Sequence, residues 1–366
     1  MAHGRRRAVE RGEAVTVDGP GLRHGDAPRA EVAILCTLLD TLGDSAVRDL
    51  AWLLLSADLL RPQRPVGELA TPFETPRQLD ETVDWLRALD AAPAQLHHDL
   101  AATRITRLGR YAERLLGWFL QQGPAARLVA AGVPLRRAGV TLGECDFLVR
   151  TRENAQLHWE LAVKCYLHAG EEAAQQASQS DERLSMRFST QLSAPLSHYV
   201  GPNLKDRFDL KLAHLLNHQL PLSAREDFAS VGYPGPWTPQ MFVKGWLFYR
   251  HGGRSRDPAE LNPAHGRGWW VTRGDWLDFA STHARHWRIL PRLEWLAPRR
   301  YRHDQREAAN AVFVDAQTLA VETSLQPGPT MVAAFAEDSA GNLLERSRGF
   351  IVPDDWPERA RAYARQ

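Results

Sequence analysis

The sequence has few cysteines and little net charge, and both features narrow the possible functions. Three cysteines occur in 366 residues, and none of them forms a CxxC pair. A zinc cluster or a disulfide framework is therefore not expected, and a reducing compartment such as the cytoplasm fits this composition. The formal net charge is +1, so the whole chain carries no electrostatic signature of nucleic-acid binding. Any such surface must come from local clustering of basic residues.

Long apolar runs are also missing. No stretch reaches the length needed to cross a membrane, and the N-terminus lacks the apolar core of a signal peptide. We therefore expect a cytoplasmic protein with no membrane partner. Residues 1–30 are rich in arginine, glycine and charge, and such a segment buries too little apolar surface to become ordered. We predict a disordered tail there.

Hydrophobic periodicity and turn residues divide the rest of the chain into three regions. Residues 31–103 place leucines and tryptophans at helical spacing and predict an N-terminal helical region. Residues 104–250 predict an α/β core with a polar insertion at 168–198. Residues 251–366 mix strand and helix patterns and predict an α+β extension packed on the core. The chain shows no internal repeat, P-loop or dinucleotide-binding glycine motif.

Two adjacent strands predicted at 143–150 and 157–166 carry the strongest chemical signal. Side chains alternate faces along a strand, so Glu144 and Asp146 share one face of the first strand. The opposite face of that strand is predicted to be apolar and consists of Cys145, Phe147 and Val149. On the second strand the same rule gathers four residues on one face: His158, Glu160, Ala162 and Lys164.

If the polar faces of the two strands point the same way, three carboxylates and one ammonium converge. Carboxylates packed together repel one another and are costly to remove from water. A divalent cation relieves both problems, and hard cations such as Mg²⁺ or Mn²⁺ prefer carboxylate oxygens. A metal-bound water beside a lysine can hydrolyse a phosphodiester. The pattern therefore favours metal-dependent hydrolysis of nucleic acid.

This arrangement resembles the PD-(D/E)XK nuclease superfamily, in which an acidic residue on one strand is followed by an acidic residue and a lysine on the next. Asp146, Glu160 and Lys164 match these positions. The resemblance implies that all three are catalytic and that Asp146 and Glu160 bind Mg²⁺ or Mn²⁺. It also implies an α/β fold with a restriction-endonuclease-like core, a mixed central sheet flanked by helices. The chain offers the matching order of elements: a helix at 107–120, strands at 126–138, 143–150 and 157–166, a helix at 204–219 and a strand at 241–249.

One spacing departs from the superfamily pattern. The usual pattern has a single residue between the second acid and the lysine, whereas three residues separate Glu160 from Lys164. Glu160 is therefore about 7 Å further along the strand than expected, at roughly 3.3 Å per residue. Three explanations remain open: Glu160 reaches back, Glu144 supplies the missing metal ligand, or the site no longer cuts.

The helix predicted directly before the sheet contributes another candidate. In PD-(D/E)XK enzymes this helix often carries a glutamate that reaches the metal, and Glu113 resembles that residue. The resemblance therefore adds Glu113 to the candidate metal ligands. The alternative is a surface glutamate paired with Arg110 or Arg114.

The helix predicted at 204–219 has a basic second face. Lys211 is the first candidate on this face for binding nucleic-acid phosphates, followed by Arg207 and His214. A solvated charged face with no ligand explains the same pattern. His214 and His218 have the spacing of a helical metal pair, but the glutamate of the HExxH motif is missing, so zinc is not expected there.

Several stretches of the chain are similar to one bacterial family, domain of unknown function 1853, which is placed in the same superfamily. They lie at 47–54, 143–147, 159–166, 199–207, 244–249 and 348–353. The resemblance implies a nuclease that hydrolyses DNA or RNA. Two alternatives remain: an inactive nucleic-acid or protein-binding module on a nuclease fold, and a purely structural network of acids around Lys164.

Two basic or aromatic features have open interpretations. Lys244, in the predicted strand at 241–249, is either functional or an edge-strand lysine that prevents aggregation. Trp269 and Trp270, which lie between two arginines, suit base stacking, but core packing is the favoured explanation because tryptophans occur throughout the chain.

Overall fold

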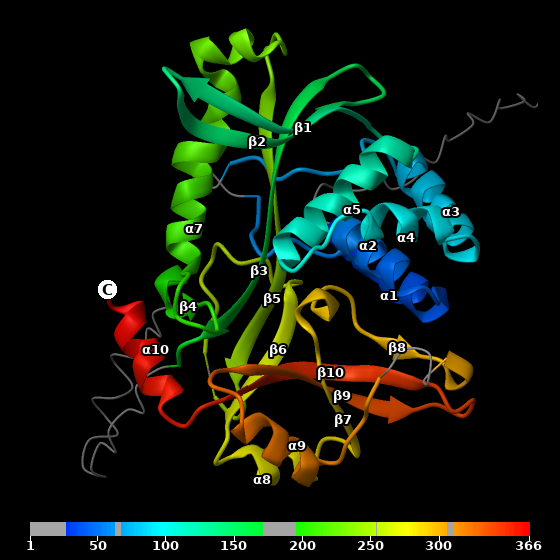
Figure 1. Cartoon of the computed structure of the whole chain (residues 1–366), viewed down its shortest axis with the longest axis vertical. Coiled ribbons are helices and arrows are strands. Elements are labelled where there is room, and N and C mark those ends of the chain that lie inside the picture. The colour runs from blue at the N-terminus through cyan, green and yellow to red at the C-terminus, as the bar shows by residue number, and fades with distance from the viewer. Residues whose placement is uncertain (1–26, 63–66, 171–194, 254, 306–310) are drawn as a thin grey trace, which may run out of the picture.

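The computed structural model describes residues 27–366, except 63–66, 171–194, 254 and 306–310. One mixed sheet runs through the molecule, and helices cover both of its faces (Figure 1). Most of the tail predicted at 1–30 and most of the insertion predicted at 168–198 lie outside the described residues. The predicted end of the tail is too late, because a helix begins at Ala27. Among the residues that are described, no helix is long and apolar enough to cross a membrane.

The sheet has ten strands in the order β1-β2-β3-β5-β6-β10-β9-β7, with β4 paired to β3 and β8 paired to β10. β1, β2 and β3 are antiparallel, whereas β3, β5, β6 and β10 run parallel. The α/β class and the mixed sheet flanked by helices are therefore confirmed. The strands are β1 (Arg127–Arg137), β2 (Val140–Arg150), β3 (Gln156–His168), β4 (Tyr199–Val200), β5 (Thr238–Arg250), β6 (Gly266–Thr272), β7 (His286–Ile289), β8 (Arg300–Tyr301), β9 (Thr330–Glu337) and β10 (Leu343–Val352).

Capping residues mark where two helices of the N-terminal region begin. Asp44 caps α2 by accepting hydrogen bonds from two backbone N–H groups of its first turn, and Thr75 caps α3 with proline in the following position. The helices are α1 (Ala27–Thr41), α2 (Ser45–Leu55), α3 (Pro76–Ala91), α4 (Ala94–Ala101), α5 (Leu108–Gln122), α7 (Phe208–His214), α8 (Trp276–Ser281), α9 (Ala316–Ser324) and α10 (Trp356–Ala364).

The largest hydrophobic core lies between these N-terminal helices and one face of the sheet. The Trp52 ring of α2 stacks on the Trp246 ring of β5, with centroids 5.9 Å apart. On the other face α7 and the turns that follow it cover β3 and β5. The C-terminal strands extend the same sheet through β6, and Trp270 of that strand is completely buried. Core packing is thus the correct interpretation of Trp270.

Several local predictions are wrong. β5 lies between β3 and β6 and Lys244 is buried, so Lys244 is not an edge-strand lysine. Instead, its ammonium is 3.1 Å from the carboxylate of Asp58. The helix predicted from 204 begins only at Phe208, and its last turn, Leu215–Gln219, is a π-helix. Cys145 packs in a cluster with Leu148 and not with Phe147, because β2 turns away from β3 between them.

Candidate functional site

The middle of β3 has one open edge. The ladder between β2 and β3 ends where Phe147 faces Trp159, and the ladder between β4 and β3 begins only at Leu167. Asp146 is the first residue of β2 beyond that ladder, and its carboxylate accepts the backbone N–H of Leu161 at 2.9 Å. A side chain therefore takes the place of a strand neighbour, and Asp146 marks the point where the sheet opens.

Glu160 lies directly behind Asp146 and is completely buried. Its Oε1 accepts the backbone N–H of Asp146 at 3.3 Å and is 2.8 Å from Nε2 of His158. Its Oε2 accepts a hydrogen bond from Nε2 of Gln219 at 2.6 Å. Both carboxylate oxygens of Glu160 are thus held by groups of the chain itself, and Glu160 fixes the position of the Asp146 backbone.

The contacts of Glu160 belong to a chain of polar side chains that crosses from β3 to the helical layer. Nδ1 of His158 is 2.9 Å from the hydroxyl of Ser223, and the amide oxygen of Gln219 accepts a hydrogen bond from Lys211 at 2.8 Å. Buried polar groups need such partners, because each one left without a partner costs about 1–3 kcal/mol. The chain therefore holds Glu160 and Lys211 in fixed positions relative to each other.

Glu113 and Glu144 approach Asp146 from the other side. Arg110 of α5 donates to Glu113 at 2.7 Å and lies 3.8 Å from Glu144 of β2. The ion pair with Arg110 proposed for Glu113 is thus present. This ion pair does not remove Glu113 from the site, because the charge of Asp146 still raises the pKa of Glu113. The four carboxyl groups predicted from the sequence are therefore brought together from α5, β2 and β3.

Three of these carboxyl groups have raised pKa values because they are buried close to one another. Burial raises the pKa of Asp146 to about 7, and the charge of Glu160 adds to the shift. Burial likewise raises the pKa of Glu160 to about 7, with a smaller contribution from Glu113. The pKa of Glu113 is raised by burial and by Asp146. Such crowded acids are most stable when they share protons or a cation.

The predicted cations are distributed differently from the sequence prediction. Lys164 pairs with Asp206, whereas Lys211 is the ammonium whose charge acts on both Asp146 and Glu160. Burial and the nearby Lys164 lower the pKa of Lys211. Arg207 is bound by both carboxylate oxygens of Asp209, and His214 is exposed. Of the three predicted phosphate-binding residues, only Lys211 lies beside the acids.

Two cavities meet at these acids, with volumes of about 810 Å³ and 530 Å³. They share Arg107, Arg110 and Glu113, and together we call them the groove. The larger cavity contains Glu144 and Asp146, and the smaller one contains the open edge of β3. Cationic side chains line both parts: Arg104, Arg107, Arg110 and Arg114 in the first, and Lys164, Lys205, Lys211 and Arg292 in the second.

The sequence was also compared with known proteins. Residues 48–352 match the family model described as domain of unknown function (DUF1853). The chain belongs to this family. No curated protein and no solved structure matches the chain. The range that matches DUF1853 contains all the residues of the candidate site described above, from Arg104 to Arg292.

A buried group of three potential metal ligands occurs among the described residues of this DUF1853 protein. Ligand atoms of Cys145, His158 and Glu160 are all within 4.8 Å of one another, and the three residues are buried. However, both ring nitrogens of His158 already have hydrogen-bond partners. Burial raises the pKa of the Cys145 thiol to about 12, which keeps it protonated. The three residues therefore form a buried cluster in which His158 and Glu160 are hydrogen-bonded to each other, and the protonated Cys145 offers zinc no thiolate ligand.

Gln219 and Ser223 are the members of the site that sequence reasoning missed. Gln219 lies at the end of the π-helical turn, where the backbone departs from the 3.6-residue period used to assign faces. Ser223 follows a proline in a short 3₁₀ segment and reaches His158 from a distant part of the chain. Neither residue carries a recognisable motif, so only the tertiary structure reveals them.

Proposed function

We propose that the protein is a metal-dependent nuclease of the PD-(D/E)XK type, which hydrolyses phosphodiester bonds of DNA or RNA. The groove is the observation that supports this proposal most strongly. It combines three carboxyl side chains, those of Glu113, Glu144 and Asp146, with cationic walls on both sides. A nucleic-acid backbone needs cations along its length and a divalent metal at the bond that is cut. The core would then be restriction-endonuclease-like.

The donor set suits Mg²⁺ or Mn²⁺. The side chains that line the groove at its centre offer carboxylate oxygens, which are the ligands that hard cations prefer. We assign Asp146 and Glu113 as the principal ligands and Glu144 as a further one. Glu160 is completely buried and its oxygens are already bound, so we assign it to holding Asp146 in place. A bound ion would polarise the phosphate and lower the pKa of a water molecule.

Two lysines have separate roles in this proposal. Lys211 lies close enough to Asp146 and Glu160 for their charges to act on its ammonium group. Its lowered pKa suits a group that exchanges protons. We assign it to orienting the attacking water and stabilising the charge on the phosphorus centre. Lys164 lines the smaller cavity with Lys205 and would bind an adjacent phosphate of the strand. In the reaction, water adds to phosphorus, one P–O bond breaks, and the leaving oxygen takes up a proton.

One observation favours a second candidate function, an inactive binding module on the same fold. Ala162 occupies the position on β3 where the superfamily pattern has its second acid, and the oxygens of Glu160 are engaged by Gln219 and His158. A groove that kept its cations and lost its metal would still bind nucleic acid through its phosphates. Metal binding separates the two functions.

The test is a cleavage assay on single- and double-stranded DNA and RNA with Mg²⁺ or Mn²⁺. We would compare the wild type with Asp146→Asn and Lys211→Gln. Asp84→Asn is the matched control, because Asp84 is an exposed acid on α3 paired with Arg87. Cleavage by the wild type and the control, lost in the two groove variants, is the expected result. Equal cleavage by Asp146→Asn rejects the proposal. Nucleic-acid binding without cleavage, in a protein that Mn²⁺ does not stabilise thermally, supports the binding module.

A further inference from the structure

A third cavity is separate from the groove. It has a volume of about 530 Å³ and is bounded by the N-terminal end of α2, the end of α3 and the segment around β8. None of the residues that line it also lines the groove. We call it the arginine cavity, because four guanidinium groups line it: Arg48, Arg299, Arg300 and Arg302.

The carboxylates that line the arginine cavity are already committed to other groups. Asp44 accepts two backbone N–H groups of α2 and is 2.8 Å from Nε2 of His97. Asp90 accepts the backbone N–H groups of Gly43 and Asp44. Glu294 is bound by both terminal nitrogens of Arg288 and by a tyrosine hydroxyl. Two of the four arginines are paired with acids outside the lining, Arg299 with Asp49 at 2.6 Å and Arg302 with Asp304 at 3.3 Å. Among the described residues, Arg48 and Arg300 are the two cavity arginines that have no carboxylate oxygen within 4 Å.

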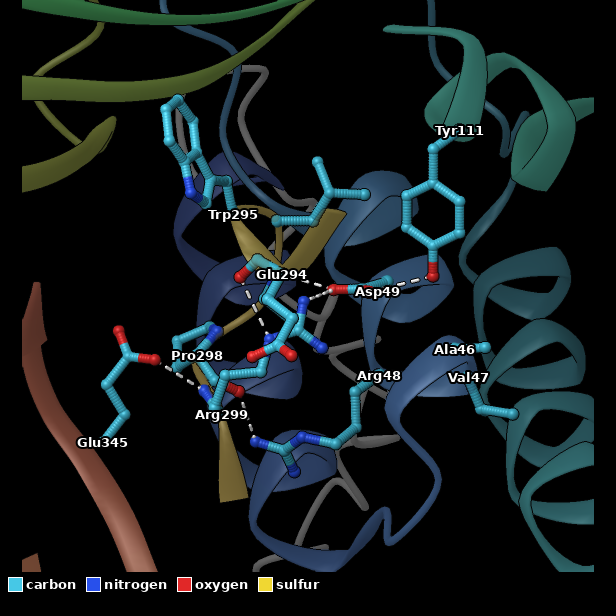
Figure 2. Close-up of polar contacts among 12 residues, drawn as sticks. Ala46, Val47, Arg48, Asp49, Tyr111, Glu294, Trp295, Pro298, Arg299 and Glu345 are labelled. Atoms are coloured by element: carbon cyan, nitrogen blue, oxygen red, sulfur yellow. Dashed lines mark hydrogen bonds and ion pairs between the residues drawn. The ribbon is translucent and has the colours of Figure 1, made fainter. Parts of the chain in front are cut away.

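Arg48 is a buried cation, and Figure 2 shows its guanidinium hydrogen-bonded to the backbone carbonyl of Pro298. Its guanidinium donates only to backbone carbonyls, at 2.9 Å to Leu42, at 2.8 Å to Pro298 and also to Leu39. Among the described residues no carboxylate oxygen lies within 4 Å of it, and its Nε has no acceptor. Buried cations are usually paired, because an unpaired charge in the interior is costly.

Arg300 repeats the pattern at the rim of the cavity. It donates to the backbone carbonyl of Asp40, and its buried Nε also lacks an acceptor in the described part of the chain. Burial lowers the pKa of Arg48 to about 10, and the charges of Arg299 and Arg300 contribute to this shift. Positive charge is therefore crowded here in a way that a bound anion would relieve.

We propose that the arginine cavity binds a phosphate-bearing anion. Guanidinium groups present planar pairs of donors that match phosphate oxygens, which makes arginine the preferred residue for such sites. The volume lies within the range of small-molecule pockets. A neighbouring cavity of about 410 Å³ shares Arg300 and Arg302 and offers room for the rest of the ligand. A free nucleotide and the phosphorylated end of a nucleic acid both carry this chemistry.

The experiment is calorimetric titration of the full chain without divalent metal, so that the groove cannot bind phosphate through an ion. The probes are pyrophosphate, adenosine monophosphate, and a short oligonucleotide with either a 5′-phosphate or a 5′-hydroxyl. The test variants are Arg300→Gln and Arg302→Gln, both at partly or fully exposed positions that should fold. The controls are Arg359→Gln, whose arginine pairs with Asp355 on the surface, and Lys211→Gln in the groove.

We expect saturable binding of pyrophosphate by the wild type and both controls, and a Kd at least about tenfold higher in each test variant, since a charged hydrogen bond contributes about 1.5–3 kcal/mol. Tighter binding of the monophosphate assigns the site to a free nucleotide. Tighter binding of the 5′-phosphorylated oligonucleotide assigns it to a strand end. Absence of saturable binding, unchanged affinity in Arg300→Gln, or loss only in Lys211→Gln overturns the proposal. Because the metal-dependent nuclease is tested through Asp146, the two proposals can fail separately.

Discussion

At the scale of single residues, Asp146 connects the fold to the proposed chemistry. Its carboxylate replaces a backbone partner of β3, and its backbone N–H is held by Glu160. The same burial that fixes it also raises its pKa to about 7. A carboxyl group with such a raised pKa readily loses its proton when a divalent cation binds, because the cation supplies the countercharge that the protein interior lacks.

The raised pKa of Asp146 predicts how stability changes with pH. An acid whose pKa is higher in the folded protein than the unfolded value of 3.8 binds more protons in the folded state. The free energy of unfolding of the metal-free protein therefore falls as pH rises from about 4 to about 7. Asp146→Asn should reduce this fall, measured by urea unfolding across that range. Burial lowers the pKa of His158 to about 4, so this residue acts with the opposite sign. The charge of Asp146 raises the pKa of His158, so its loss in Asp146→Asn lowers that pKa further and also reduces the fall. An identical pH dependence in the two proteins would show that Asp146 titrates normally.

Replacement of Lys164 distinguishes a functional role of this lysine from a purely structural one. Its side chain is 29% exposed and its partner Asp206 is 34% exposed, so the ion pair is largely screened by water. We predict that Lys164→Ala lowers the free energy of unfolding by less than about 1 kcal/mol. Cleavage should fall roughly 100-fold, the size of effect seen when one stabilising donor is removed. A large loss of stability with unchanged cleavage would instead favour the purely structural network.

At the scale of elements, the sequence predicts what depends on local periodicity. Faces on β3 follow the two-residue period, because that strand stays in the sheet along its whole length. Glu160 and Lys164 were therefore placed correctly on one face. Cys145 was not, because the ladder between β2 and β3 ends at Phe147, where the Asp146 side chain takes over the hydrogen bond to the β3 backbone. The role of Gln219 could not be predicted for a similar reason. It lies in a π-helical turn, so the 3.6-residue period does not give the face on which its side chain lies.

The close packing of β5 against β3 beside Lys164 can be tested with a glycine substitution. Gly245 has φ of +146°, and a Cβ there would lie 1.7 Å from the carbonyl oxygen of Lys164. We predict that Gly245→Ala lowers the free energy of unfolding by more than about 4 kcal/mol, through strain and steric clash together. Gly252→Ala is the control, because Gly252 has φ of +72° but open space around it. It should cost only about 1–2 kcal/mol. Similar losses in chemical denaturation of both variants would refute the clash.

At the scale of the whole molecule, two of the regions expected from the sequence, the core and the C-terminal extension, share one sheet. A buried polar connection joins both of them to the N-terminal helices. Asp49 of α2 accepts hydrogen bonds from the backbone of Ala297 at 2.9 Å, from Arg299 at 2.6 Å and from the hydroxyl of Tyr111 at 3.0 Å (Figure 2). These groups are far apart in the chain. Single-sequence reasoning divides a chain at its loops and cannot see such pairings, which is why the C-terminal extension was described separately from the sheet it continues.

Breaking this connection should destabilise the whole protein. Asp49 and Arg299 are 2% and 5% exposed, so Asp49→Asn leaves a buried guanidinium without its countercharge. We predict a loss of about 3–5 kcal/mol in the free energy of unfolding. Asp355→Asn, which breaks the exposed pair with Arg359, should cost less than about 1 kcal/mol. Thermal and urea unfolding measure both effects, and a mild loss in Asp49→Asn would mean that the network contributes little to holding the regions together.

The most direct test of the proposed function is a titration with Mn²⁺, followed by electron paramagnetic resonance, of the wild type, Asp146→Asn and the control Asp84→Asn. We predict that the wild type and the control bind the ion and that Asp146→Asn weakens the affinity at least about 100-fold, more than the loss of a residue that only supports a ligand. No binding by the wild type, or equal binding by Asp146→Asn, would contradict a metal site in the groove.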